Sequence, residues 1–143
     1  MLGMSMVFRM LEPTRRPVIV LEDDPILRAE LVGWIGGWGW RALPLDPTLG
    51  LPQSGDHLYA AAVVADFDLG LAVAGMPART GLDIALSIAR RMGKTVPTVI
   101  LSGSYGRLEL AACSPHQIPV LFKPVQPNEL HHWLMQSVPL LRV

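Results

Sequence analysis

The sequence contains several short apolar runs, rich in β-branched residues, that each end at a polar side chain. Four such runs cover residues 18–21, 61–65, 96–101 and 118–122, and a weaker one covers residues 40–43. Continuous apolar runs of this length are typical of strands buried on both faces, as in a parallel sheet covered by helices. The sequence therefore predicts a buried parallel sheet of five strands.

Apolar residues recur with helical spacing between these runs. The pattern predicts a helix over residues 27–38, another over residues 80–91 and a third that begins near Pro127. Thr80 and Asp83 have the spacing of a capping box, which marks the start of the second of these helices. Residues 107–113 predict a short helix.

The alternation of strands and helices predicts one domain, a three-layer α/β/α sandwich of the flavodoxin-like kind. Two further prolines and two glycines follow Pro44 within residues 44–58, so we expect the second helix of this fold to be short, distorted or missing. Residues 1–16 are interrupted by Arg9, Glu12 and Pro13 and predict a flexible tail before a domain at 17–143.

The composition excludes several classes of protein. Twelve basic residues balance twelve acidic ones, so no overall charge favours nucleic acid or an anionic membrane. No apolar stretch approaches the roughly 18 residues that a transmembrane helix needs. Cys113 is the single cysteine and predicts a buried thiol in a reducing, cytoplasmic setting.

Polar side chains follow the predicted strands at their carboxyl ends, where ligands bind in sheets of this kind. Glu22, Asp23 and Asp24 follow the first strand, Asp66 and Asp68 the third, Ser102 the fourth and Lys123 the fifth. Carboxylates this close repel one another unless a cation lies between them, and hard oxygen ligands favour Mg²⁺, Mn²⁺ or Ca²⁺. Beside Mg²⁺ a carboxylate can serve as a nucleophile toward a phosphoryl group. We expect Asp24 to cap the first helix.

Five motifs in order, VIVLEDDPILR, AAVVADFDLG, TGLDIA, VILSGS and VLFKPV, resemble the CheY-like receiver domain of two-component response regulators. The resemblance extends from about Arg16 to the end of the chain. It implies that Asp66 is the phosphoacceptor, that Glu22 and Asp23 form the acidic metal pair, and that the backbone carbonyl of Asp68 completes the metal ligands together with Asp66. The implied cofactor is Mg²⁺.

The resemblance also implies roles for the remaining site residues. Ser102 would be the switch hydroxyl, Lys123 the phosphoryl-binding lysine, and Lys123–Pro124 a cis peptide bond. Asp68 and Ser104 would border the pocket and tune hydrolysis of the phosphoaspartate. Two features depart from the family pattern: the loop over residues 67–80 is longer, and Val120 stands where an aromatic residue is usual.

The implied function is a phosphoacceptor switch that is not an enzyme beyond self-phosphorylation and self-dephosphorylation. Its expected partners are a sensor histidine kinase or a histidine phosphotransfer protein, and an effector or a second copy bound through the face formed by the fourth helix, fifth strand and last helix. One alternative is a degenerate receiver that binds proteins without phosphate. Another is a phosphatase of the haloacid-dehalogenase type, since Asp66-Phe67-Asp68 resembles its DxD signature. That family needs an acidic motif after the lysine, and only Glu129 follows Lys123.

Overall fold

A computed structural model describes residues 16–46, 55, 59–69, 80–103 and 107–139. Five parallel strands form one sheet in the order β2-β1-β3-β4-β5. The strands are β1 (Val18–Leu21), β2 (Ala42–Pro44), β3 (Ala62–Asp66), β4 (Thr98–Ser102) and β5 (Val120–Phe122). The predicted α/β fold with a five-stranded parallel sheet is confirmed.

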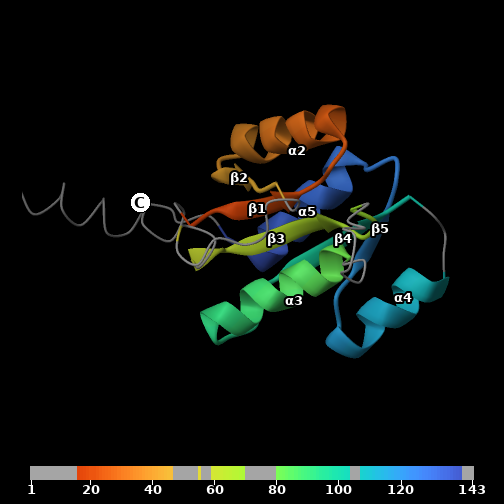
Figure 1. Ribbon diagram of the computed structural model, residues 1–143. Helices are drawn as coiled ribbons and strands as arrows, with labels where there is room; N and C mark the ends of the chain where they lie inside the picture. The colour runs from red at the N-terminus through yellow and green to blue at the C-terminus, as the bar shows by residue number, and fades with distance from the viewer. Residues whose placement is uncertain (1–15, 47–54, 56–58, 70–79, 104–106, 140–143) are drawn as a thin grey trace, which may run out of the picture.

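Helices cover both faces of the sheet (Figure 1). They are α2 (Pro25–Gly37), α3 (Gly81–Met92), α4 (Arg107–Cys113) and α5 (Pro127–Ser137), and a 3₁₀ turn, η3 (Ser114–His116), follows α4. Alternate residues of a strand point to opposite faces, so β1 directs Val18 and Val20 toward α2 and α5, and Ile19 and Leu21 toward α3. The result is a three-layer sandwich with a core on each side of the sheet.

Residue-level signals explain where the helices begin and end. Asp24 caps α2 as expected, because its Oδ1 accepts a hydrogen bond from the Ile26 amide at 2.9 Å. The predicted capping box of α3 is present, with Thr80 and Asp83 each accepting from the other's backbone amide. Gly93 ends α3 with a φ of 70°, a left-handed conformation that suits glycine.

The first predicted strand, residues 18–21, coincides with β1, and the other four are offset from the observed strands by one to two residues at one or both ends. Prolines precede β4 and β5 at positions 97 and 119, and because proline has no amide hydrogen it limits where a strand begins. At the other end, β3 and β4 each include the polar residue that the prediction placed just beyond them. Asp66 pairs with Leu101 inside the sheet, so the strand backbone itself fixes its position.

Some sequence predictions lie outside the described residues. They concern the tail up to residue 15, most of the segment 44–58 and residues 70–79 of the long loop. Within the described part of the chain, no helix has the length and apolarity to cross a membrane.

Candidate functional site

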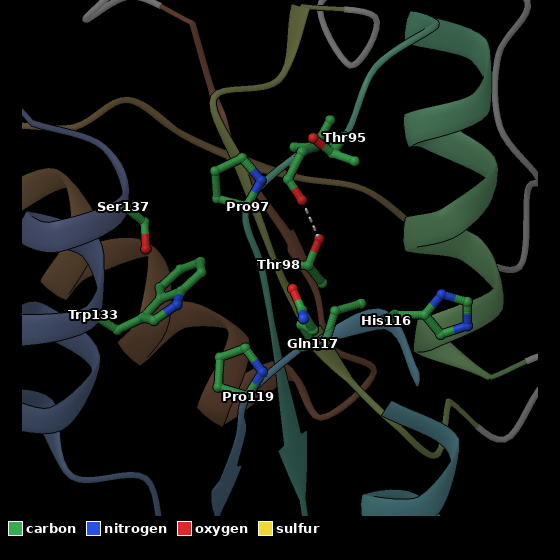
Figure 2. A pocket seen from close by; sticks show the side chains of 10 residues that line it. Thr95, Pro97, Thr98, His116, Gln117, Pro119, Trp133 and Ser137 are labelled. Carbon is green, nitrogen blue, oxygen red and sulfur yellow. Dashed lines mark hydrogen bonds between the residues drawn. The ribbon is translucent and has the colours of Figure 1, made fainter. Parts of the chain in front are cut away.

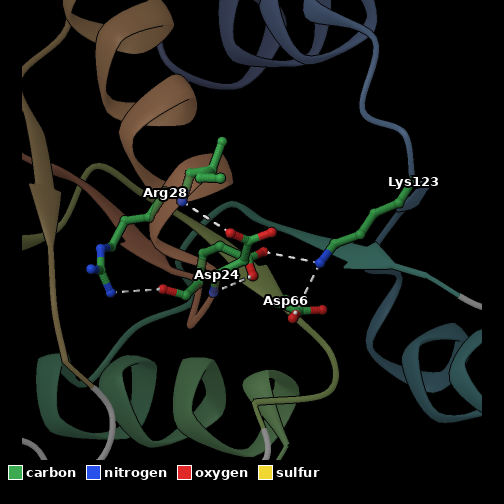
Figure 3. A network of polar contacts seen from close by, with 6 residues as sticks. Asp24, Arg28, Asp66 and Lys123 are labelled. Atoms are coloured by element: carbon green, nitrogen blue, oxygen red, sulfur yellow. Dashed lines mark hydrogen bonds and ion pairs between the residues drawn. The ribbon is translucent and has the colours of Figure 1, made fainter.

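Three side chains from three different strands meet at the carboxyl edge of the sheet (Figure 3). Lys123, which follows β5, places its Nζ 3.1 Å from Oε2 of Glu22 and 3.3 Å from Oδ2 of Asp66. Glu22 is fully buried after β1, and Asp66 is 5% exposed at the end of β3. The predicted convergence of these residues is present, and one ammonium bridges two buried carboxylates.

The turn between β1 and α2 holds Glu22 in place. Its Oε1 accepts a hydrogen bond from the Asp24 amide at 3.1 Å, and its backbone oxygen accepts one from Nη1 of Arg28 at 3.3 Å. One carboxylate oxygen therefore faces the backbone of the turn, and the other faces Lys123. The sequence pattern did not indicate a role for Arg28, although this residue lies within the motif VIVLEDDPILR.

The start of α3 holds Asp66 in place from the other side. The amide of Phe67 donates to Leu101 at 2.9 Å, and the amide of Gly81 donates to the carbonyl of Phe67 at 3.0 Å. A Cβ atom on Gly81 would overlap the main-chain carbonyl of Asp66, so this approach requires glycine. Gly81 also went unrecognised as a site residue, although it lies within the motif TGLDIA.

The surroundings of Asp66 change its acidity. Burial, followed by the nearby charge of Glu22, raises the pKa of Asp66 from 3.8 to about 7, against the opposing effect of Lys123. Burial disfavours the charged form of Lys123, but the carboxylates of Asp66 and Glu22 outweigh that effect and raise the pKa of its ammonium group. Lys123 is therefore a positive charge at neutral pH, and Asp66 resists ionisation while no further cation is present.

Glu22, Asp23 and Asp66 form an acidic cluster in which one carboxylate oxygen from each lies within 4.8 Å of the others. Glu22 and Asp66 are buried and Asp23 is exposed, so the cluster opens to solvent on one side. Three carboxylates outnumber the single ammonium of Lys123, and all the donors are hard oxygens. This donor set fits Mg²⁺ and similar cations.

The remaining predicted residues occupy varied positions. Ser102, the last residue of β4, is 1% exposed, and its backbone oxygen accepts a hydrogen bond from the Lys123 amide at 2.8 Å. The Lys123–Pro124 bond is cis, the isomer that the resemblance implied. Asp68 is exposed and is not a member of the acidic cluster, while Ser104 lies outside the described residues. Val120 is half-buried in β5.

Comparison with known proteins identifies the fold. No protein-family model and no curated protein sequence matches the chain. Among solved structures, a response regulator receiver protein from Pseudomonas putida is 22% identical, with a TM-score of 0.61 over 85% of this chain and 97% of its own. The chemotaxis protein CheY4 from Vibrio cholerae is 14% identical, with a TM-score of 0.63 over 86% and 98%.

The signal receiver domain of an HD domain-containing protein from Pseudomonas fluorescens is also similar, with 16% identity and a TM-score of 0.65 over 86% of this chain and 94% of that one. These identities are low, so the likeness concerns the fold. The chain has the CheY-like fold of response regulator receiver domains.

Proposed function

We propose that this chain is a phosphorylation-controlled signalling domain in which Asp66 accepts a phosphoryl group. The observation that carries the proposal is the meeting of Glu22, Asp66 and Lys123 at one edge of a receiver-type sheet, with Asp23 beside them. These are the residues to which the sequence motifs assigned the phosphoacceptor, metal and phosphoryl-binding roles. Asp23 adds a third carboxylate to this ion pair, and a cluster of oxygen ligands of this kind suits a divalent cation.

The proposed reaction moves a phosphoryl group from a phosphohistidine to Asp66. A carboxylate oxygen of Asp66 forms a bond to phosphorus while the phosphorus–nitrogen bond breaks, and the leaving imidazole takes up a proton. Glu22, Asp23, Asp66 and the backbone carbonyl of Asp68 would hold Mg²⁺, which supplies positive charge to the transferred group. Lys123 offsets negative charge on the phosphoryl oxygens, and the hydroxyl of Ser102 donates to them in the product.

The proposed partners follow from this chemistry. The donor would be a sensor histidine kinase or a histidine phosphotransfer protein in the cytoplasm. Pulling Ser102 and Lys123 toward the new phosphoryl group would shift the face formed by α4, β5 and α5, which would bind an effector or a second copy. In this proposal the chain is a switch and not an enzyme acting on other substrates.

The decisive experiment is intact-protein mass after incubation with acetyl phosphate, with and without Mg²⁺. We expect one Mg²⁺-dependent phosphoryl adduct on the wild type and none on Asp66→Asn. Asp24→Asn is the matched control, because Asp24 is an exposed helix cap in the same turn as the acidic cluster, and it should be phosphorylated like the wild type.

The other outcomes distinguish the alternatives. A wild-type chain that binds Mg²⁺ but never gains a phosphoryl group would contradict the switch and favour a phosphate-independent binding module. Steady turnover of a phosphomonoester, abolished in Asp66→Asn, would favour the phosphatase instead.

A further inference from the structure

Two adjoining hollows lie at the amino edge of the sheet, at the opposite end of the strands from the acidic cluster. The first, of about 310 Å³, lies between the loops that precede β4 and β5 and the C-terminal half of α5. Figure 2 shows the ring of Trp133 directed into it, with Pro97 and Pro119 on the other side. The second, of about 640 Å³, lies between α4 and β5 and includes Leu110 and Val120.

Gln117 lines both hollows and has an unfavourable backbone conformation. Its φ of 57° is left-handed, which side-chain-bearing residues other than Asn and Asp seldom adopt. Glycine would suit this position better, because the turn after η3 needs only the backbone amide of Gln117, which donates to Ser114. The glutamine side chain is therefore not required by the turn, and it lies at the junction of the two hollows.

The walls indicate what kind of molecule fits. Among the described residues that line the two hollows there is no Asp, Glu, Lys or Arg. The surfaces combine Trp133, prolines and aliphatic side chains with uncharged hydroxyl groups and the imidazole of His116. The amide of Gln117 offers both a donor and an acceptor between the two hollows. An extended apolar peptide matches this pattern, since its side chains can fill adjoining hollows while its main chain pairs with an amide.

This chain itself contains such a peptide. Residues 1–11, MLGMSMVFRML, carry eight large apolar residues and one charge, Arg9. Four of the eight are methionines, whose unbranched side chains adapt to irregular apolar surfaces.

The point of attachment also fits. The carbonyl of Pro17 accepts a hydrogen bond from Ala61, and that of Pro97 accepts one from Val63, so Pro17 and Pro97 flank the start of β3 on either side. Pro97 borders the first hollow. Two strand spacings, about 10 Å, separate these prolines, and the five residues 12–16 span about 16 Å when extended.

We propose that the hollows beside Gln117 form a docking site for residues 1–11 of the same chain, with apolar side chains placed against Trp133 and around Ile118. The site is separate from the acidic cluster and lies at the amino end of the face formed by α4, β5 and α5. In this proposal the side chain of Gln117 recognises the bound segment, which accounts for a glutamine at a position whose backbone conformation favours glycine.

The test uses the 143-residue chain labelled at its methionine methyl groups. We expect nuclear Overhauser contacts between methyls of Met4, Met6 or Met10 and the Trp133 ring. Phe8→Asp should remove them and make the amides of residues 116–118 and 120 exchange about threefold faster. Ser5→Asp is the matched control, since it adds the same charge at a polar position and should leave both measurements unchanged.

Substitutions at Gln117 separate recognition from folding. Gln117→Gly should retain or raise the Tm, by about 2 °C, because it relieves the left-handed conformation, and yet it should weaken the contacts to Trp133. A structural role alone would not produce that combination. The proposal is overturned if no such contacts are seen, if they survive Phe8→Asp, or if a mixed-label sample shows that they join two different chains.

Discussion

Gly81 packs directly on the main chain of Asp66, and a Cβ atom at position 81 would overlap the carbonyl oxygen of Asp66. The Gly81 amide meanwhile donates to the carbonyl of Phe67. The first residue of α3 is thus in contact with the end of β3. The position of the Asp66 carboxylate depends on the absence of a side chain at position 81.

We therefore expect Gly81→Ala to destabilise the fold by about 2–4 kcal/mol, since the overlap is with backbone that cannot move aside freely. It should also weaken Mg²⁺ binding in the fraction that folds. Urea unfolding and calorimetric Mg²⁺ titration measure the two effects. Gly33→Ala is the control: nothing lies within 4 Å of its Cβ position in α2, so it should stabilise by about 0.5–1 kcal/mol. Equal effects of the two substitutions would contradict the packing argument.

Asp66→Asn should stabilise the metal-free protein at alkaline pH. The pKa of Asp66 is raised from 3.8 to about 7, so the folded state holds this proton more tightly than the unfolded state. The stability that Asp66 contributes is complete below pH 3.8 and is lost as the pH rises through 7. In EDTA, we expect Asp66→Asn to raise the unfolding free energy by about 1–3 kcal/mol at pH 8 and by less at pH 5.

Adding Mg²⁺ at pH 8 should stabilise the wild type, since a cation offsets the repulsion among the carboxylates. The difference in unfolding free energy between the wild type and Asp66→Asn should therefore become smaller. Urea unfolding at both pH values, with EDTA or Mg²⁺, measures these differences. If Asp66→Asn raised the unfolding free energy equally at both pH values, the buried carboxylate would be ruled out as the cause.

Lys123→Met should destabilise the protein at neutral pH by about 1–3 kcal/mol, because it leaves the fully buried Glu22 without its ammonium partner. The added substitution Glu22→Gln should restore part of the loss, which a double-mutant cycle by urea unfolding would measure as coupling. Lys94→Met serves as control, since Lys94 is exposed after α3, and its effect should lie within about 0.5 kcal/mol. Independent, additive effects of Lys123 and Glu22 would refute the pairing.

Trp40→Phe should cost about 2–3 kcal/mol, because it removes the hydrogen bond that Nε1 of Trp40 donates to the carbonyl of Val138 at 2.9 Å and leaves a cavity where the buried indole was larger. Phenylalanine retains one aromatic ring but neither this donor nor the rest of the indole. The loss should be local, so hydrogen exchange near the C-terminal end of α5 should accelerate more than exchange in β1. Uniform acceleration across the domain would indicate a packing defect instead.

The fold was largely predictable because its strands are buried on both faces, which gives continuous apolar runs at positions such as Val18 to Leu21. Boundaries were less predictable. The pattern ended each strand at the last apolar residue, whereas backbone pairing carries β3 through Asp66 and β4 through Ser102. Side-chain polarity marks where a strand meets solvent or a site, but hydrogen bonds to the neighbouring strand decide where it stops.

The site was predictable in its charged residues and not in its supports. Glu22, Asp66 and Lys123 each follow or end a strand, so parallel topology alone brings them to one edge. Arg28 acts through a backbone carbonyl and Gly81 through the absence of a side chain. Neither contact has a sequence pattern of its own, since both depend on how closely separate segments approach in three dimensions.

The strand order has a consequence for the way this protein is made. During synthesis, Glu22 and Asp66 emerge well before Lys123, so β1 and β3 can pair while the two carboxylates still lack their ammonium partner. Until β5 joins β4, the nascent chain holds repelling charges at one edge of an unfinished sheet. The last strand therefore completes the sheet and removes that repulsion in the same step, which favours closure of the sheet only after β5 and Lys123 have left the ribosome.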